Sequence, residues 1–397
     1  MQTDLFRRAA ILGLLSAVGP FAIDMYLPAM PQIAEALETS EAGTQATLAA
    51  YFVCFGIAQL VYGPWSDAVG RRKPLLVGLA IFILGSIGAA LAPSIGTLTA
   101  ARALQGLGAA VVMVIPRAII RDWFTGNEAT RLMAMVMLVI SVSPMLAPLA
   151  GSMVILAFDW RAIFVILGLA AVASLTLVLT ALPETLQPER RVPVRFRTLL
   201  TGARRLLSDA KFMCLTFLGG FGMASFFVFI ASASFVYTGQ FGLSPTGFSV
   251  AFAVNAAGFF GASQFAAYLG TRFGATRVIA FAAAGFALAT LTLLALVLAG
   301  FGTLPVIVIM LLLGNACLGL IIPTTMVLAL DDQGDIAGLA SSMGGTLQML
   351  TGSAMIGLAS PFFDGTALPM VTAIAVCGVA VFTLSRLVLR QSQLSPV

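Results

Sequence analysis

The sequence contains no histidine and few charged residues, since lysine, arginine, aspartate and glutamate make up only 9% of its 397 residues. Soluble domains carry about 25% charged residues, so a water-soluble globular fold is excluded. The four cysteines, Cys54, Cys214, Cys317 and Cys377, lie singly inside apolar runs. They indicate small core residues rather than a disulfide framework or a metal site. With 60% hydrophobic residues, the composition predicts an integral membrane protein.

The apolar segments are long and lack strand-like alternation, which predicts membrane-spanning helices of about 20 residues each. Polar, proline and glycine clusters divide the chain into twelve segments, near 9–31, 45–65, 75–92, 97–119, 132–156, 161–181, 212–237, 245–270, 277–299, 304–329, 337–359 and 367–388. We therefore expect an all-α integral membrane protein with twelve transmembrane helices. These form two pseudo-symmetric six-helix halves, 1–181 and 212–397, joined by a cytoplasmic linker at 182–211.

Basic residues gather on one side of the predicted bilayer. Of the 21 lysine and arginine residues, all but Arg102 and Arg161 fall in loops or ends on the same side as both termini. The positive-inside rule makes that side cytoplasmic. The net charge of +5 thus follows membrane topology and does not indicate a nucleic-acid partner. The basic linker 182–211 is either a simple tether or carries a short amphipathic helix that lies on anionic lipid.

Two charged residues, Asp24 and Arg102, fall deep inside predicted spans, where a charge costs from about 3 to more than 10 kcal/mol. Counting along the helices places them at similar depth, so we expect them to meet or to share a cavity. Burial opposes ionisation of a carboxyl group, and a nearby guanidinium favours it. This balance suits Asp24 to carry a proton, with Arg102 as its electrostatic partner. A static ion pair between the two spans is the alternative, although apolar residues often replace such a pair at no cost.

The loop between the second and third spans carries the most distinctive motif. It reads GPWSDAVGRRKP, in which Gly70 allows a tight turn and an aspartate lies close enough to two arginines for charge-assisted hydrogen bonds. We predict a conformational latch that breaks during transport, made of Gly63, Asp67, Gly70, Arg71 and Arg72. A turn that only sets topology is the alternative. The loop after the eighth span repeats the glycine at Gly274, which indicates an internal repeat.

This loop pattern, G-x-x-x-D-x-x-G-R-R, resembles the signature loop of the major facilitator superfamily. The first span contains AIDMYLPAMP, beginning at Ala22, and resembles the bicyclomycin/chloramphenicol-resistance (Bcr/CflA) subfamily of drug:proton antiporters. The fourth span contains RALQGLG, beginning at Arg102, and resembles the superfamily motif whose arginine is linked to proton coupling. Segments 226–229 and 334–338 are similar to the phenicol exporters of that subfamily. The resemblance implies a monomeric transporter of the bacterial inner membrane that needs no cofactor.

Prolines predict irregular helices in two spans. Pro20, Pro28 and Pro31 lie in the first span, where freed carbonyl groups are tolerated if they line a cavity. The fifth span contains SPMLAPLAG and is similar to the antiporter motif of the superfamily, from which it departs by alanine at 147 and 150 and serine at 152. By that resemblance, its hinge residues are Pro144, Pro148 and Gly151.

The second half has no charged residue in 212–271 or 278–330, so its polar groups there are amides and hydroxyls. An apolar cavity with a few hydrogen-bonding groups suits amphipathic, drug-sized molecules better than sugars or phosphates. We predict that aromatic and amide side chains bind the substrate: Tyr26, Tyr51, Phe55, Gln105, Phe227, Asn255, Phe259, Asn315 and Gln348.

The sequence therefore predicts proton-coupled efflux of drug-like molecules, of a multidrug or a phenicol or bicyclomycin type, by alternating access. Its partners are the drug, protons and the lipid bilayer. A passive facilitator, or an exporter of a metabolite with the same fold, is the alternative. An enzyme is excluded because intramembrane chemistry needs a nucleophile with a base, paired acids or a metal site. Without histidine or a second deep carboxylate, the spans supply none of these.

Overall fold

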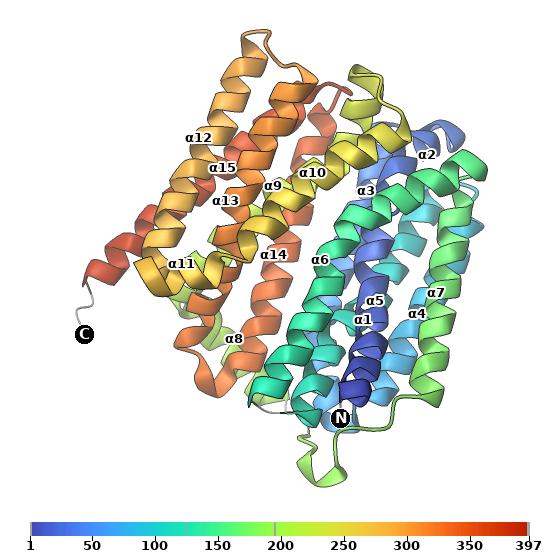
Figure 1. Cartoon of the computed structure of the whole chain (residues 1–397), viewed down its shortest axis with the longest axis vertical. Coiled ribbons are helices and arrows are strands. Elements are labelled where there is room, and N and C mark those ends of the chain that lie inside the picture. Colours follow the sequence, from blue (N-terminus) through green and yellow to red (C-terminus); the bar gives the residue numbers. More distant parts are fainter. Residues whose placement is uncertain (1, 125, 194–195, 395–397) are drawn as a thin grey trace. The chain divides into compact units, whose positions relative to one another are not determined.

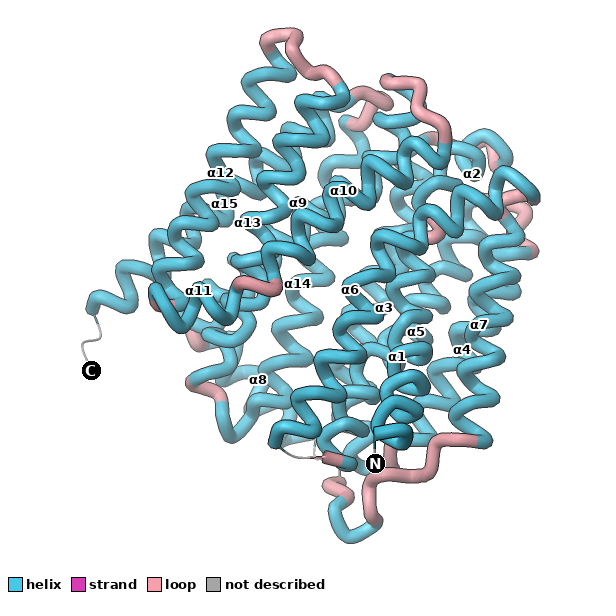
Figure 2. The backbone as a smooth tube through the Cα atoms, viewed as in Figure 1, coloured by secondary structure: helices cyan, strands magenta, loops and turns pink. Residues whose placement is uncertain are grey.

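The structure is a computed structural model that describes residues 2–124, 126–193 and 196–394. These residues form helices and the turns between them, and none of them lies in a strand (Figures 1 and 2). The expected all-α class is confirmed. The chain divides into two compact units, Met1–Arg195 and Phe196–Val397.

The first unit is organised around a central helix, α5. This helix packs against α3 and α4, while α1 packs on α6 and α4 on α7. The elements of the unit are α1 (Gln2–Asp24), η1 (Leu27–Ala29), α2 (Met30–Ala36), α3 (Glu41–Val69), α4 (Arg72–Ala90), α5 (Ile95–Trp123), α6 (Gly126–Ala157), α7 (Arg161–Thr180) and η2 (Pro188–Arg190).

The second unit repeats this pattern of packing. Its central helix α13 contacts α10 and α12, while α9 packs on α14 and α12 on α15. The elements are α8 (Phe196–Ser208), α9 (Ala210–Phe235), η3 (Val236–Gln240), α10 (Pro245–Ser263), α11 (Ala266–Phe273), α12 (Ala275–Leu298), α13 (Leu304–Asp331), η4 (Gly334–Ile336), α14 (Ala337–Ala359), η5 (Ser360–Phe362) and α15 (Ala367–Leu394). The same helix pairs in both units are what an internal repeat requires.

Eleven helical segments of the described chain are long and apolar enough to cross a membrane, judged by length and composition. The remaining predicted span, 337–359, coincides with helix α14, which is rich in glycine, serine and threonine. Two predicted spans are interrupted, the first between α1 and α2 and the eighth between α10 and α11. Together with α14, the eleven segments account for the twelve predicted spans.

Local sequence signals fix several helix ends. Ser40, Ser94 and Ser244 precede α3, α5 and α10, and their hydroxyl oxygens accept hydrogen bonds from backbone N–H groups of the first turn. At the other end, Gly70 follows α3 and Gly274 follows α11, with φ of +99° and +88°. Backbone in this region favours glycine, so the two matched glycines of the repeat perform the same structural task.

Candidate functional site

The first span is broken directly after Asp24, the last residue of α1. A turn at Met25 and Tyr26 leads into η1, which contains Pro28, and proline lacks the N–H that would continue the helix. Asp24 is 4% exposed and is the one carboxyl residue that is buried among the residues described. The predicted irregularity of this span is confirmed, and it brings a carboxyl group into the interior of the first unit.

Arg102, on α5, is fully buried beside this break. Its Nη1 donates hydrogen bonds to the carbonyl oxygen of Ala22 at 3.0 Å and to Oε1 of Gln105 at 2.8 Å. The last carbonyl groups of a helix lack helical partners, so the guanidinium satisfies one that the end of α1 leaves free. Within the described chain, its Nε and Nη2 have no hydrogen-bond partner. Gln105 is held in turn by donating from Nε2 to Oγ of Ser86 at 2.8 Å.

Two tyrosine rings enclose the guanidinium. The ring centres of Tyr26 and Tyr51 lie 4.6 and 4.5 Å from Cζ of Arg102, which is the range of a cation–π interaction. The Tyr26 hydroxyl is hydrogen-bonded to Thr47 at 2.7 Å, and the Tyr51 hydroxyl donates to the carbonyl oxygen of Gly19 at 3.3 Å. The predicted substrate residues of this unit therefore form one cluster around Arg102: Tyr26, Tyr51, Phe55 and Gln105.

Asp24 and Arg102 are both buried in the first unit, but they do not form an ion pair there. Among the residues that the structure describes, no hydrogen bond reaches the Asp24 carboxylate, and the guanidinium is held by Ala22, Gln105 and the two tyrosine rings. The two residues are linked instead through the last turn of α1. Asp24 belongs to this turn, and Arg102 binds its Ala22 carbonyl oxygen. Their role in proton coupling stays a prediction.

Helix α6 passes close to the same break at Gly151. A Cβ atom there would collide with the carbonyl oxygen of Met25, so only glycine permits this approach. Pro144 and Pro148 lie inside α6, which continues through both, so neither ends the helix as the first span ends after Asp24. Membrane helices tolerate proline where neighbouring groups or local adjustment satisfy the freed carbonyl groups. The hinge function assigned to these three residues stays a prediction.

A matched pair of backbone contacts joins the central helix of each unit to its neighbour. On α5, a Cβ at Gly106 would collide with the carbonyl oxygen of Tyr51 on α3. On α13, a Cβ at Gly319 would collide with the carbonyl oxygen of Phe259 on α10. These glycines allow the helices to approach until backbone touches backbone.

The structure brings the predicted residues Asn255 and Asn315 together in the second unit. Both are buried, and Nδ2 of Asn315 donates to Oδ1 of Asn255 at 3.3 Å, while Nδ2 of Asn255 donates to the carbonyl oxygen of Ala251 at 3.1 Å. In the part of the chain that the structure describes, Oδ1 of Asn315 has no hydrogen-bond partner. This oxygen can therefore accept a hydrogen bond from a ligand that carries a donor.

The two predicted phenylalanines of this unit lie in different surroundings. Phe259 stacks on Phe226, with ring centres 5.7 Å apart and an angle of 19° between the ring planes. Phe227 packs instead against α14, where a Cβ at Gly352 would collide with its ring. Phe259 lies one helical turn after Asn255 on α10, whereas Phe227 faces α14.

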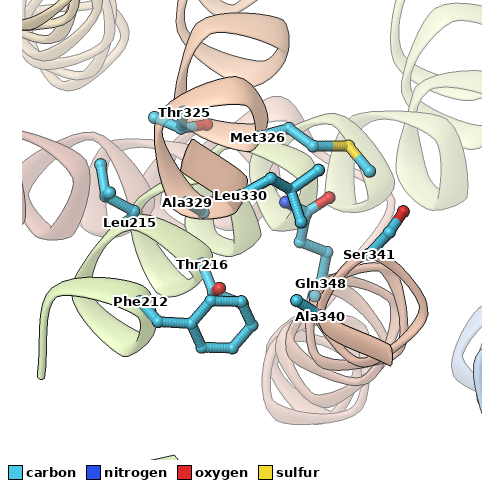
Figure 3. Close-up of a pocket in the computed structure, with 11 residues that line it drawn as sticks. Phe212, Leu215, Thr216, Thr325, Met326, Ala329, Leu330, Ala340, Ser341 and Gln348 are labelled. Carbon is cyan, nitrogen blue, oxygen red and sulfur yellow. The ribbon is translucent and has the colours of Figure 1, made fainter. Parts of the chain in front are cut away.

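Gln348 lines a small pocket between α9, α13 and α14, and its amide points into it (Figure 3). The cavity holds about 10 Å³, which is room for a single water molecule. Thr216 and Thr325 lie on its wall, and Oγ1 of Thr216 is buried without a hydrogen-bond partner among the residues described. Gln348 is thus placed at a polar site of its own, apart from the asparagine pair.

The loop after α3 forms a charge network within the first unit. Arg71 is 6% exposed and donates from Nε to Oδ2 of Asp122 at 2.9 Å, from Nη1 to Oγ of Ser66 at 2.9 Å, and to the carboxylate of Asp67. Burial alone lowers the pKa of Arg71, but the hydrogen bonds to Asp122 and Asp67 raise it above its ordinary value. Arg72 points elsewhere and donates from Nη2 to two carbonyl oxygens in the last turn of α7, at 3.3 and 3.0 Å.

Glu184 closes this network over the glycine of the motif. A Cβ at Gly70 would lie 2.5 Å from Oε2 of Glu184 and displace the carboxylate, and the positive φ favours glycine. The carboxylate accepts hydrogen bonds, at 2.8 to 3.2 Å, from the backbone N–H groups of Arg71, Arg72, Thr185 and Leu186. Burial opposes ionisation of Glu184, and the four N–H donors outweigh it and lower its pKa.

Sequence reasoning missed several members of both clusters. Asp122 and Glu184 complete the network around the loop. Each is an acidic residue just beyond a predicted span, Asp122 after the fourth and Glu184 after the sixth, and this position could have indicated them. Gly63 belongs to the network through its carbonyl oxygen, which accepts from Oγ of Ser66 at 2.9 Å. No sequence signal pointed to Phe164, whose ring centre lies 5.9 Å from Cζ of Arg102.

The helices, their pairing in two similar units and the buried charged cluster are those of a multi-pass membrane transporter. The sequence profile of the Major Facilitator Superfamily matches residues 12–356, and the chain belongs to that superfamily. Its relatives group it with the Bcr/CflA drug:proton antiporter subfamily, as the motifs indicated.

Three relatives illustrate this grouping. The "Uncharacterized MFS-type transporter YdgK" of Bacillus subtilis is 36% identical, over 91% of this chain and 90% of its own length. The "Bicyclomycin resistance protein homolog" of Haemophilus influenzae is 30% identical over 95% and 94%. The "Chloramphenicol resistance protein" of Pseudomonas aeruginosa is 36% identical over 61% and 56%.

A solved structure supports the fold alone. The D-xylose–proton symporter matches with a TM-score of 0.74 at 15% identity, over 96% of this chain and 97% of that one. The shared architecture is that of the superfamily and carries no information about the substrate.

Proposed function

We propose that this protein exports drug-like amphipathic molecules in exchange for protons, by alternating access, with Asp24 as the proton carrier. The observation that carries the proposal is the position of Asp24, the one buried carboxyl residue of the described chain, at a break in a membrane-spanning helix. Ionisable residues inside membrane spans are costly and mark ion or substrate pathways. One such carboxyl group corresponds to about one proton per transport cycle.

Arg102 couples the protonation of Asp24 to a change in the conformation of the protein. Its guanidinium remains charged, and its Nε and Nη2 lack hydrogen-bond partners among the described residues. When Asp24 releases its proton, the new carboxylate attracts this cation and competes with Gln105 and the Ala22 carbonyl group for its N–H donors. A ligand shifts an equilibrium only through different interactions with two states, and the protonated and ionised forms of Asp24 differ in this interaction.

The binding groups favour a substrate that has both apolar and hydrogen-bonding parts. In the first unit, aromatic rings surround Arg102, and in the second the Asn255–Asn315 pair and Gln348 supply amides. Relatives named for bicyclomycin and chloramphenicol resistance support antibiotics of these types as substrates. An apolar site with few polar groups is typical of drug-sized ligands.

The distribution of basic residues supports a bacterial inner-membrane location with both termini in the cytoplasm. In this orientation the network of Asp67, Arg71, Asp122 and Glu184 lies at the cytoplasmic side of the first unit. We assign it the role of the latch, which holds one conformation and opens during transport. The protein acts as a monomer and uses the proton gradient without a cofactor.

The decisive experiment measures drug-driven proton flux in vesicles that contain the purified protein. Asp24→Asn should abolish proton flux, while Asp364→Asn, at an exposed loop carboxylate, serves as the matched control and should retain it. Normal coupled flux in Asp24→Asn would refute the assignment. If the unaltered protein moves drug equally well without a proton gradient, the protein is a passive facilitator instead.

A further inference from the structure

Helix α8, Phe196–Ser208, belongs to neither the buried cluster nor the charge network. Its sequence, FRTLLTGARRLLS, contains three arginines and no acidic residue. It lies in the basic segment for which a tether and an amphipathic helix were the alternatives. The structure shows a helix, and the exposure of its side chains indicates what it contacts.

One side of α8 packs on the second unit. Leu206 is fully buried, and Gly202 is buried so closely that a Cβ would lie 2.6 Å from Cδ2 of Leu339 on α14. This side is covered by α14 and α9. It fixes the rotation of the helix about its axis and thereby decides which residues face outward.

A second side of α8 exposes leucine next to arginine. Leu200 and Leu207 are 59% and 52% exposed, and being seven residues apart they share one side of the helix. Arg197 and Arg204 are exposed beside them, each three residues before a leucine and so on the adjacent flank. Within the described chain neither arginine has an ion pair or a side-chain hydrogen bond. Exposed leucines flanked by arginines are typical of a helix that lies in a membrane surface.

The position of α8 along the chain places it at that surface. The helix ends at Ser208, and α9, which is long and apolar enough to span a membrane, begins at Ala210. Between them, Asp209 accepts hydrogen bonds from the N–H groups of Lys211 and Phe212 and so caps α9. The end of α8 is therefore within two residues of the start of a membrane span.

We propose that α8 is an interfacial helix that binds anionic phospholipid headgroups at the cytoplasmic leaflet. Leu200 and Leu207 insert at the boundary between headgroups and acyl chains, and Arg197 and Arg204 bind lipid phosphates. The excess of positive charge selects anionic over zwitterionic lipid. The helix then anchors the start of the second unit to the bilayer, whatever molecule the protein transports.

The test uses spin labels on the full chain in vesicles, with the four native cysteines replaced by alanine. Labels are attached at Leu200→Cys and Leu207→Cys, with Thr201→Cys, exposed on a different side of the same helix, as the matched control. In vesicles containing phosphatidylglycerol, the two leucine positions should be relaxed by oxygen in the bilayer and shielded from a water-soluble nickel complex. The Thr201 label should show the reverse. Equal exposure of all three labels to the nickel complex overturns the proposal.

A second arm identifies the lipid charge. Replacing phosphatidylglycerol by phosphatidylcholine, or introducing Arg197→Gln and Arg204→Gln, should reduce the ratio of lipid-embedded to water-exposed label by about fivefold per arginine. Inorganic phosphate should have no effect. If shielding is the same in both lipids and in the double variant, another surface covers the helix and the proposal is wrong. If the cysteine-free chain does not fold, hydrogen exchange of residues 197–208 in the unmodified chain tests the same proposal. Exchange should be slower with phosphatidylglycerol than with phosphatidylcholine, and equal rates overturn the proposal.

Discussion

Asn315 holds on α13 the place that Arg102 holds on α5. Each lies one helical turn before the glycine, Gly319 or Gly106, that touches the backbone of the neighbouring helix. The repeat therefore carries a permanent cation in the first unit and a neutral amide in the second. Among the residues described, the buried charged side chains lie in the first unit, and the corresponding place in the second offers hydrogen bonds without a charge.

Replacing Asn315 with leucine should separate two kinds of substrate. The change replaces the amide with an apolar side chain of similar size and removes both the acceptor oxygen and the hydrogen bond to Asn255. A hydrogen bond contributes about 0.5–1.5 kcal/mol, so the KM for a hydrogen-bonding drug such as chloramphenicol should rise by up to about tenfold. The KM for tetraphenylphosphonium, which has no such group, should not change. Transport assays in vesicles check this, and an equal rise for both compounds would assign the pair a structural role.

Gly106→Ala should destabilise the first unit, because the added methyl group collides with the carbonyl oxygen of Tyr51. Overpacking of this kind costs about 1–3 kcal/mol. Gly96→Ala on the same helix is the control, since a Cβ there meets open space among the described residues. Thermal unfolding in detergent measures the difference. Equal midpoints for the two variants would show that α3 and α5 separate easily.

The two glycines of the repeated loop should differ in their tolerance of alanine. Both have positive φ, and a strained backbone costs of order 1–3 kcal/mol. Only Gly70→Ala also collides with Glu184, because the space around Gly274 is open among the residues described. Gly70→Ala should therefore lower the unfolding midpoint more than Gly274→Ala, and adding Glu184→Ala should recover part of the difference. No recovery would mean that Glu184 yields to the methyl group.

Stability should depend on pH through Glu184. The four N–H donors outweigh burial and lower the pKa of this carboxyl group in the folded protein. The unfolded chain therefore binds more protons below its own pKa, near 4.3, and the stabilisation present above that value is lost as the pH falls through the folded pKa. Glu184→Gln should unfold at a lower temperature than the unaltered protein at neutral pH and converge with it in acid. A constant difference across that range would exclude this role.

Composition and apolar segment length predicted the helical class, the twelve segments and their repetition, because burial in a bilayer constrains every span in the same way. The break in the first span also followed from its prolines. At Pro144 and Pro148 the prolines do not end a helix, since α6 continues through both. Local sequence shows that a helix must adapt to proline, but the neighbouring helices decide how it does so.

The sequence identified Asp24 and Arg102 but not their contacts. The tyrosine rings and the Ala22 carbonyl group reach the guanidinium from segments far from α5 in the chain, whereas Gln105 lies three residues along the same helix. Such contacts depend on helix rotation, which motif spacing does not encode. Glu184 was missed for the same reason, because its carboxylate binds backbone N–H groups more than 110 residues away.

At the contact of Gly106 with the Tyr51 carbonyl oxygen, the packing of two helices depends on backbone atoms, whereas substrate binding depends on side chains. At this point α3 and α5 approach until a glycine meets a main-chain carbonyl, so the closest approach depends on backbone and not on a side chain. Residues around that point are free to change size and polarity while the two helices keep their spacing. A transporter built in this way can acquire a new range of substrates by exchanging side chains, without having to evolve a new scaffold.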